Sequence, residues 1–170
     1  FVGMEKQSGF KITAPLAIRA FASVVYGDLL ARCLYRVRPY EAVKGSANAL
    51  YEKWNEKIKA DLKKISLKKY KENMKAIVKD FNELPVLDIK KPRVGIVGEI
   101  MVKFHPVANN FAVDLVESEG AEAVVPDLMG FVYFICDHAN SRHELLTVSN
   151  SRYYWSNKAI KAFEWLEKPY

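Results

Sequence analysis

The segment over residues 93–127 constrains the fold of this chain more than any other part of its sequence. It opens with a short apolar run, which is followed by a glycine-containing turn and a polar loop. An amphipathic stretch over residues 107–119 and a second apolar run complete it. The order strand, loop, helix, strand is the unit that builds parallel sheets and places ligand loops beyond the strand ends. We therefore expect an α/β fold with a short parallel, Rossmann-like sheet, whose strands lie near residues 93–98 and 122–126.

Helical patterns dominate the rest of the first half of the chain. Apolar residues cover so much of residues 15–36 that we expect a helix buried on more than one side. Two further helices are predicted by apolar residues at three- and four-residue steps, with Ser46 and Ser66 as suitable N-caps. The sequence thus predicts a mostly helical layer over residues 1–91 and a Rossmann-like α/β part over residues 92–170. We expect the two to form one compact domain that is a fragment of a longer chain.

The positive charge of the chain comes from one region. Residues 53–91 hold twelve lysines and six acidic residues, and 12 − 6 equals the net charge of +6. This region contains no arginine, the residue best suited to bidentate phosphate recognition, so a solvated lysine face is favoured over a nucleic-acid interface. No uninterrupted apolar run approaches the ~20 residues of a membrane span, and no secretion signal is visible. We expect a cytoplasmic protein with neither a nucleic-acid nor a membrane partner.

Polar side chains follow the first predicted strand, where parallel sheets bind ligands. The helix expected next would offer unpaired N–H groups and a partial positive charge to a phosphate or a carboxylate. The glycine spacing matches neither the dinucleotide-binding fingerprint nor the P-loop. The same side chains could instead only shape the loop and begin the helix, and both alternatives remain open. The candidate ligand-binding residues are Glu99, Lys103, His105, Asn109 and Asn110.

Arg36 and Arg38 form a second candidate cluster at the expected end of the first helix. They could contact an anion or a partner, but a clamp onto carboxylates of the neighbouring layer is favoured. Cys33 and Cys136 show no metal-binding spacing and lie among apolar residues, which predicts buried thiols. No spacing typical of a metal site or of a nucleophile with its base is present. The sequence therefore predicts no catalytic residue and no metal ligand.

Four blocks of the sequence together resemble one protein family. The chain is similar to the region that follows the ATP-binding modules of large CoA-substrate-specific enzyme activases, relatives of the activator of 2-hydroxyglutaryl-CoA dehydratase. That region resembles the subunits of 2-hydroxyacyl-CoA dehydratases and benzoyl-CoA reductases. The blocks are RVRPYE (residues 36–41), SANALYEKW (46–54), KPRVGIVGEIMVKFHPVANN (91–110) and ESEGAEAVVPDL (117–128).

The resemblance implies a supporting role in ATP-driven electron transfer for the dehydration or reduction of an acyl-CoA in anaerobic metabolism. It implies ATP and a [4Fe–4S] cluster in the full-length protein or its partner, and a fragment that is inactive alone. The implied partners are other domains of the same polypeptide and a 2-hydroxyacyl-CoA dehydratase-type component, with acyl-CoA as a candidate ligand. Since such a cluster takes about four thiolates, neither cysteine is assigned to it. The alternative is a docking module between activase and dehydratase that has no small-molecule site.

Overall fold

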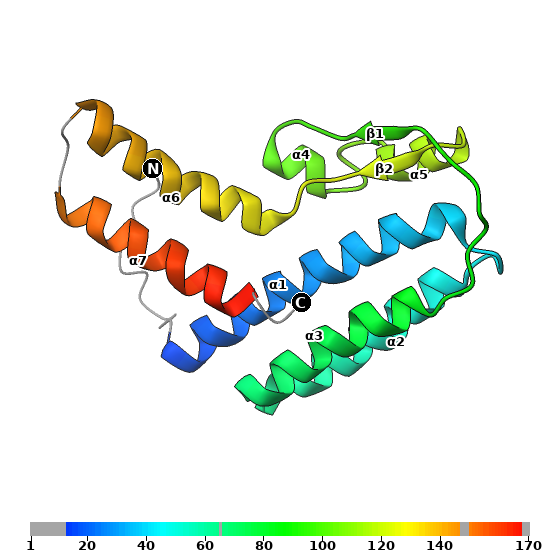
Figure 1. Ribbon diagram of the computed structural model, residues 1–170, viewed down its shortest axis with the longest axis horizontal. Helices are drawn as coiled ribbons and strands as arrows, with labels where there is room; N and C mark the ends of the chain where they lie inside the picture. The colour runs from blue at the N-terminus through cyan, green and yellow to red at the C-terminus, as the bar shows by residue number, and fades with distance from the viewer. Residues whose placement is uncertain (1–12, 65, 147–149, 168–170) are drawn as a thin grey trace.

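Helix α1 (Ala14–Val37) runs through the middle of the molecule (Figure 1). The computed structural model describes residues 13–64, 66–146 and 150–167. Pro15 lies in the first turn of α1, where its missing N–H leaves no helical hydrogen bond unmade. Other elements cover α1 on both sides, so the prediction of a helix buried on more than one side is confirmed. Its buried residues are Ala22, Val25, Tyr26, Leu29, Leu30 and Leu34.

Helices α2 (Ser46–Asp61) and α3 (Leu67–Asn82) form a hairpin that packs against one side of α1. The hydroxyl of Ser66 accepts a hydrogen bond from the Lys69 amide at 3.2 Å, so the predicted N-cap of α3 is confirmed. Ser46 instead is the first residue of α2, and the cap position is held by Gly45 in a left-handed conformation. The predicted apolar stripe forms the contact with α1 through the buried residues Trp54, Ile58, Tyr70, Met74, Ile77 and Phe81.

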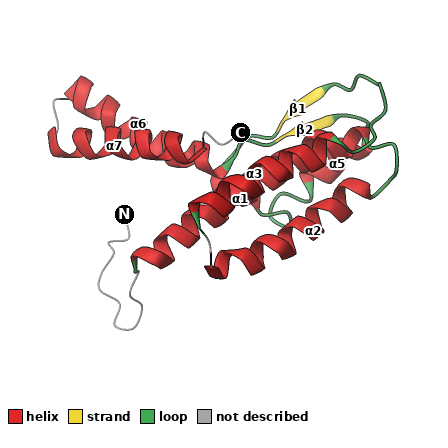
Figure 2. Ribbon diagram, turned by 60° about the horizontal axis from the view of Figure 1, so that its bottom comes forward, coloured by secondary structure: helices red, strands yellow, loops and turns green. Residues whose placement is uncertain are grey.

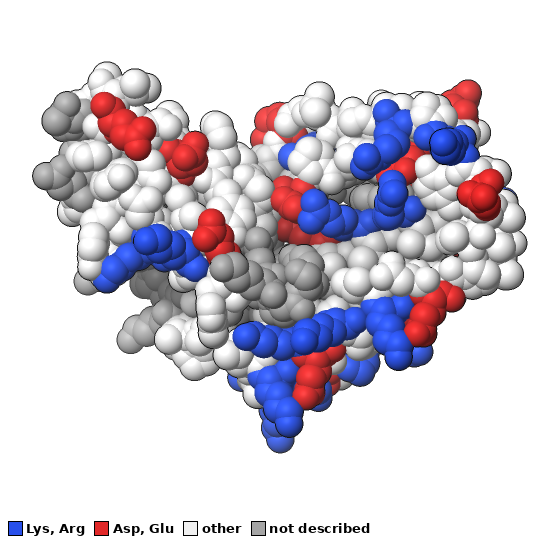
Figure 3. Space-filling view, in the orientation of Figure 1, with Lys and Arg blue, Asp and Glu red and all other residues white. Residues whose placement is uncertain are grey.

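The lysines of this hairpin lie among acidic side chains. Figure 3 shows basic residues over α2 and α3 with acidic residues between them. Asp61 pairs with two lysines, at 3.2 Å from Lys57 and 2.6 Å from Lys69. Further pairs follow the helical spacing, as between Lys79 and Glu83 at 3.6 Å. The face is therefore mixed in charge, and the absence of a nucleic-acid partner stays a prediction.

The parallel sheet consists of β1 (Arg93–Gly95) and β2 (Glu122–Val124), with Val94 opposite Ala123. The predicted Rossmann-like α/β fold is wrong, because helices make up 73% of the described residues and the sheet has only two strands of three residues each. The first apolar run is not buried on both faces, since Val94 is 41% exposed. β2 packs on α1, whereas all three residues of β1 are exposed.

Two short helices connect the strands, α4 (Ile100–Phe104) and α5 (Ala112–Ser118). The helix predicted over residues 107–119 therefore begins five residues late, and Pro106 lies in a turn instead of its first helical position. Gly120 follows α5 with φ +86°, the left-handed conformation in which helices commonly end.

The chain ends in a second hairpin, formed by α6 (Leu128–Leu146) and α7 (Asn150–Glu167), which extends away from the rest of the molecule (Figures 1 and 2). Residues 92–170 are thus mainly helical. The base of the hairpin is fixed to α1, where the rings of Phe21 and Phe163 stack at 5.1 Å.

By length and composition, the segment Ala14–Tyr40 is long and apolar enough to cross a membrane. Its most apolar stretch has a mean hydropathy of 1.3, and charged residues interrupt it, which is why no uninterrupted apolar run marks it in the sequence. The core helix of a soluble protein has the same properties. The cytoplasmic location accordingly stays a prediction.

Candidate functional site

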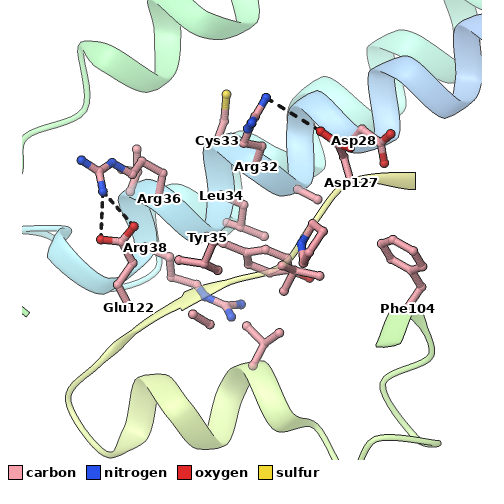
Figure 4. A pocket seen from close by; sticks show the side chains of 18 of the residues that line it. Asp28, Arg32, Cys33, Leu34, Tyr35, Arg36, Arg38, Phe104, Glu122 and Asp127 are labelled. Carbon is pink, nitrogen blue, oxygen red and sulfur yellow. Dashed lines mark hydrogen bonds and ion pairs between the residues drawn. The ribbon is translucent and has the colours of Figure 1, made fainter. Parts of the chain in front are cut away.

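An open cleft of about 990 Å³ separates the C-terminal half of α1 from residues 103–113. In Figure 4, Phe104 enters from the α4 side, opposite residues of α1, while β2 and the residues after it pass between them. Most of the lining is aliphatic or aromatic, so the cleft suits a ligand with an apolar part. Apolar residues of the lining include Val24, Ala31, Leu34, Phe104, Phe111 and Val125.

Two cations of the cleft are weakly engaged within the chain. The side chain of Arg32 is 71% exposed, and its guanidinium lies 3.9 Å from the Asp127 carboxylate. The ammonium of Lys103 lies over the Phe104 ring at 4.7 Å, and no carboxylate of the described residues is within ion-pair distance of it. Both cations are therefore available to an anionic group of a ligand.

Two of the candidate residues use their polar atoms in local turns. The Glu99 carboxylate caps α4 by accepting hydrogen bonds from the amides of Met101 and Val102, at 2.8 and 3.2 Å. The Nδ1 atom of His105 accepts from the Ala108 amide at 3.3 Å. Neither Glu99 nor His105 lines the cleft. For these two residues, the structure shows the loop-forming alternative.

Asn109 braces the loop that faces α1. Its amide nitrogen donates to the Lys103 carbonyl at 3.1 Å, and its Oδ1 accepts from the Ala112 amide at 3.2 Å. The next two residues, Asn110 and Phe111, both have φ +54°. This left-handed conformation costs a non-glycine residue roughly 1–2 kcal/mol, and such strain is concentrated at ligand clamps and active sites. The brace thus holds the Phe111 ring at the cleft.

The structure brings Lys103 and Asn109 together at the cleft, whereas Glu99, His105 and Asn110 are not part of its lining. From the opposite wall, the sequence prediction named only Arg36 and Arg38, which both line the cleft, and missed the rest of α1. One signal could have indicated it: Asp28, Arg32 and Arg36 follow at steps of four residues on an otherwise apolar helix and all line the cleft. Burial raises the pKa of the Asp28 carboxyl above its usual value. The hydrogen bonds from the amides of Leu128 and Met129 act in the opposite direction but are outweighed by burial.

Arg36 binds Glu122, the first residue of β2. Its Nη1 lies 2.8 and 2.9 Å from the two carboxylate oxygens, and Arg93 and Tyr40 donate to the same carboxylate at 3.1 and 2.8 Å. The Glu122 side chain is only 3% exposed. Burial alone would raise its pKa, but the hydrogen bonds from Arg36 and Tyr40 and the nearby arginine charges lower it overall. Glu122 is therefore ionised and joins the sheet to α1.

Arg38 makes a second clamp, between the end of α1 and α5. Its guanidinium donates to Glu117 at 2.7 and 3.1 Å and to Asp114 at 3.0 Å. Of the two alternatives for Arg36 and Arg38, the structure shows the clamp onto carboxylates of the neighbouring layer. Contact of these arginines with an anion or a partner stays a prediction.

The residues of this chain do not fit the implied [4Fe–4S] cluster. The whole sequence has two cysteines, and they lie on different helices, Cys33 on α1 and Cys136 on α6. Burial raises the pKa of the Cys33 thiol to about 11, so it is protonated at neutral pH and is a poor metal ligand. Within the described ranges, no three His, Cys, Asp or Glu side chains are grouped to hold a metal ion.

Comparisons with protein-family models, curated proteins and solved structures find no match to this chain. The family resemblance rests on the four sequence blocks alone, and the function that it implies is a proposal.

Proposed function

We propose that this chain is an acyl-CoA-binding component of a 2-hydroxyacyl-CoA dehydratase- or reductase-type system and has no activity alone. The cleft between α1 and residues 103–113 carries this proposal. Its volume of about 990 Å³ is at the upper end of the roughly 300–1,000 Å³ of small-molecule pockets.

The chemistry of the cleft suits both ends of an acyl-CoA. The acyl group and the gem-dimethyl and methylene parts of the pantetheine arm are apolar and can pack against Phe104, Phe111 and Leu34. The phosphates carry negative charge, which Lys103 and Arg32 can neutralise with charge-assisted hydrogen bonds. Electron transfer, with ATP and the iron–sulfur cluster, belongs in this proposal to other domains or partners.

The alternative function, a docking module, has less support from the contacts of Arg36 and Arg38. Arg36 and Arg38 both donate to carboxylates of their own chain, so a partner would have to compete with Glu122 and Glu117. Lys103, in contrast, has no such competitor among the described residues.

Isothermal titration calorimetry with acetyl-CoA and free CoA tests the proposal. We expect both to bind, and we expect Lys103→Ala to weaken binding about 5- to 10-fold, because one charge-assisted contact of ~1–1.4 kcal/mol is lost. Lys75→Ala, which removes an exposed lysine of α3, is the matched control and should leave the affinity unchanged. Absence of binding, or equal loss in both variants, would show that the cleft is not the site.

A further inference from the structure

Two exposed arginines share one buried carboxylate where the sheet meets α1. The Nη1 atom of Arg36 and the Nε atom of Arg93 both donate to Oε1 of Glu122, at 2.8 and 3.1 Å. The Glu122 side chain is only 3% exposed, whereas those of Arg36 and Arg93 are 63% and 60% exposed. Because both nitrogens bond to the same oxygen atom, the two guanidinium groups are held next to each other at the surface.

The backbone around these three residues fixes the arrangement. Arg36 is in the last turn of α1, and Arg93 lies opposite Glu122 in the register of β1 and β2. The Glu122 amide also donates to the Pro92 carbonyl at 2.8 Å. The arginine pair is therefore preorganised, which lowers the entropy that a ligand loses when it binds there.

Both guanidinium groups keep N–H donors that Glu122 does not use. Toward the described residues, Arg36 donates only through Nη1 and Arg93 only through Nε. An arginine carries further donors on its other guanidinium nitrogens, in a planar fork that matches two oxygens of a phosphate. A small anion can use these donors while Glu122 keeps its own hydrogen bonds.

The charge of the pair favours such an anion. Two positive charges face the single negative charge of Glu122, and no other carboxylate of the described residues lies within ion-pair distance of Arg36 or Arg93. The neighbouring acids Asp114 and Glu117 are bound to Arg38 instead. Figure 3 shows basic side chains over the C-terminal half of α1 and over β1 on the same face. One positive charge is thus left without a partner at this place.

Both arginines line the cleft that carries the proposed function. In Figure 4, Arg36 and Glu122 lie at the end of the view opposite Phe104. Arg32 precedes Arg36 by about one helical turn on α1, so phosphates of one ligand can reach both residues. Besides its diphosphate, CoA carries such an additional phosphate, a monoester on the 3′-hydroxyl of the ribose.

We propose that Arg36 and Arg93, positioned by Glu122, form a phosphomonoester site that takes the 3′-phosphate of CoA. The identity of the ligand rests on the proposed function, whereas the phosphate chemistry rests on the arginine pair itself. Lys103 and Arg32 then remain for the diphosphate, and the acyl group lies toward Phe104.

Isothermal titration calorimetry with CoA and dephospho-CoA, which lacks only the 3′-phosphate, tests the inference. We expect the unchanged chain to bind CoA about tenfold more tightly, because the two arginines add charge-assisted hydrogen bonds. Arg93→Gln should reduce this preference to about threefold or less and leave the affinity for dephospho-CoA unchanged. Arg142→Gln, which removes an exposed arginine of α6 outside the cleft, is the matched control and should keep the full preference.

Equal affinities for CoA and dephospho-CoA, or a preference for CoA that Arg93→Gln does not change, would overturn the phosphate site but leave the acyl-CoA proposal standing. Adenosine 3′-phosphate, titrated against adenosine, separates the two proposals in the other direction. If neither coenzyme binds but adenosine 3′-phosphate does, and Arg93→Gln weakens it, the phosphate site is supported and the acyl-CoA proposal fails. If none of these ligands binds, both fail. Circular dichroism checks that Arg93→Gln is folded, as we expect because Arg36 and Tyr40 still donate to Glu122.

Discussion

Glu122 is the side chain on which the attachment of the sheet to α1 depends most. Its buried carboxylate accepts hydrogen bonds from Arg36, Tyr40 and Arg93. We predict that Glu122→Gln lowers the free energy of unfolding by about 2 kcal/mol, less than the ~3–5 kcal/mol of a fully buried pair, because both arginines are largely exposed and can be rehydrated. Urea unfolding followed by circular dichroism measures this loss.

The exposed pair of Lys79 and Glu83 supplies the control for this change. Glu83→Gln also removes one carboxylate from an ion pair, but both side chains there are more than half exposed. Its effect should be within about 0.5 kcal/mol. Equal losses for Glu122→Gln and Glu83→Gln would contradict the role of Glu122.

At this scale, the sequence predicted the type of interaction of Arg36 and Arg38 but not their partners. The carboxylates that they bind lie 76 to 86 residues away along the chain. Only the packing of β2 and α5 on α1 brings these groups together, and local spacing carries no information about it. Glu99 and His105 follow a strand, a position that favours ligand binding, but their polar atoms form turns instead.

At the scale of elements, Asp28 anchors the start of α6. It accepts hydrogen bonds from the amides of Leu128 and Met129 at 2.9 and 2.8 Å. We predict that Asp28→Ala lowers the free energy of unfolding by about 1–2 kcal/mol, the usual loss for a helix cap. Hydrogen exchange should also become faster in the first turn of α6. Asp137→Ala, an exposed change on the same helix, should do neither.

The pH dependence of this anchor follows from the raised pKa of Asp28. A folded-state pKa above the unfolded value means that folding favours the neutral acid. The contribution of Asp28 to stability is therefore largest at low pH and falls as the pH rises through the raised pKa. Asp28→Asn, which keeps one acceptor oxygen, should gain stability relative to the unchanged chain as the pH rises. Unfolding midpoints that do not diverge with pH would contradict this.

Helices could be predicted from the sequence much better than the sheet. Apolar residues at three- and four-residue steps identified α2 and α3, because one face of each helix packs against α1. A three-residue strand has no comparable period, and the apolar residues Val94 and Val97 before Gly98 are exposed, so burial does not mark this strand either. The late start of α5 escaped prediction because Asn110 and Phe111 both adopt left-handed conformations, which asparagine often adopts but phenylalanine rarely does.

At the scale of the whole molecule, α1 connects all the layers. We predict that Leu30→Ala, at a buried position, lowers the free energy of unfolding by about 2–5 kcal/mol and that the chain still unfolds in one transition. Ile18→Ala removes a comparable side chain that is 62% exposed on the same helix, and it should cost less than about 0.5 kcal/mol. Circular dichroism and tryptophan fluorescence should give the same midpoint; separate transitions would show that the layers fold independently.

The proposed binding of an acyl-CoA between α1 and residues 103–113 can be tested on the chain as a whole. Hydrogen exchange measured by mass spectrometry, with and without acetyl-CoA, tests it most directly. We expect slower exchange in residues 27–38 and 103–113 when the ligand is present, and less protection in Lys103→Ala at the same ligand concentration, set near the Kd of the unchanged chain. Protection confined to the lysines of α2 and α3, or no protection anywhere at saturating acetyl-CoA, would contradict it.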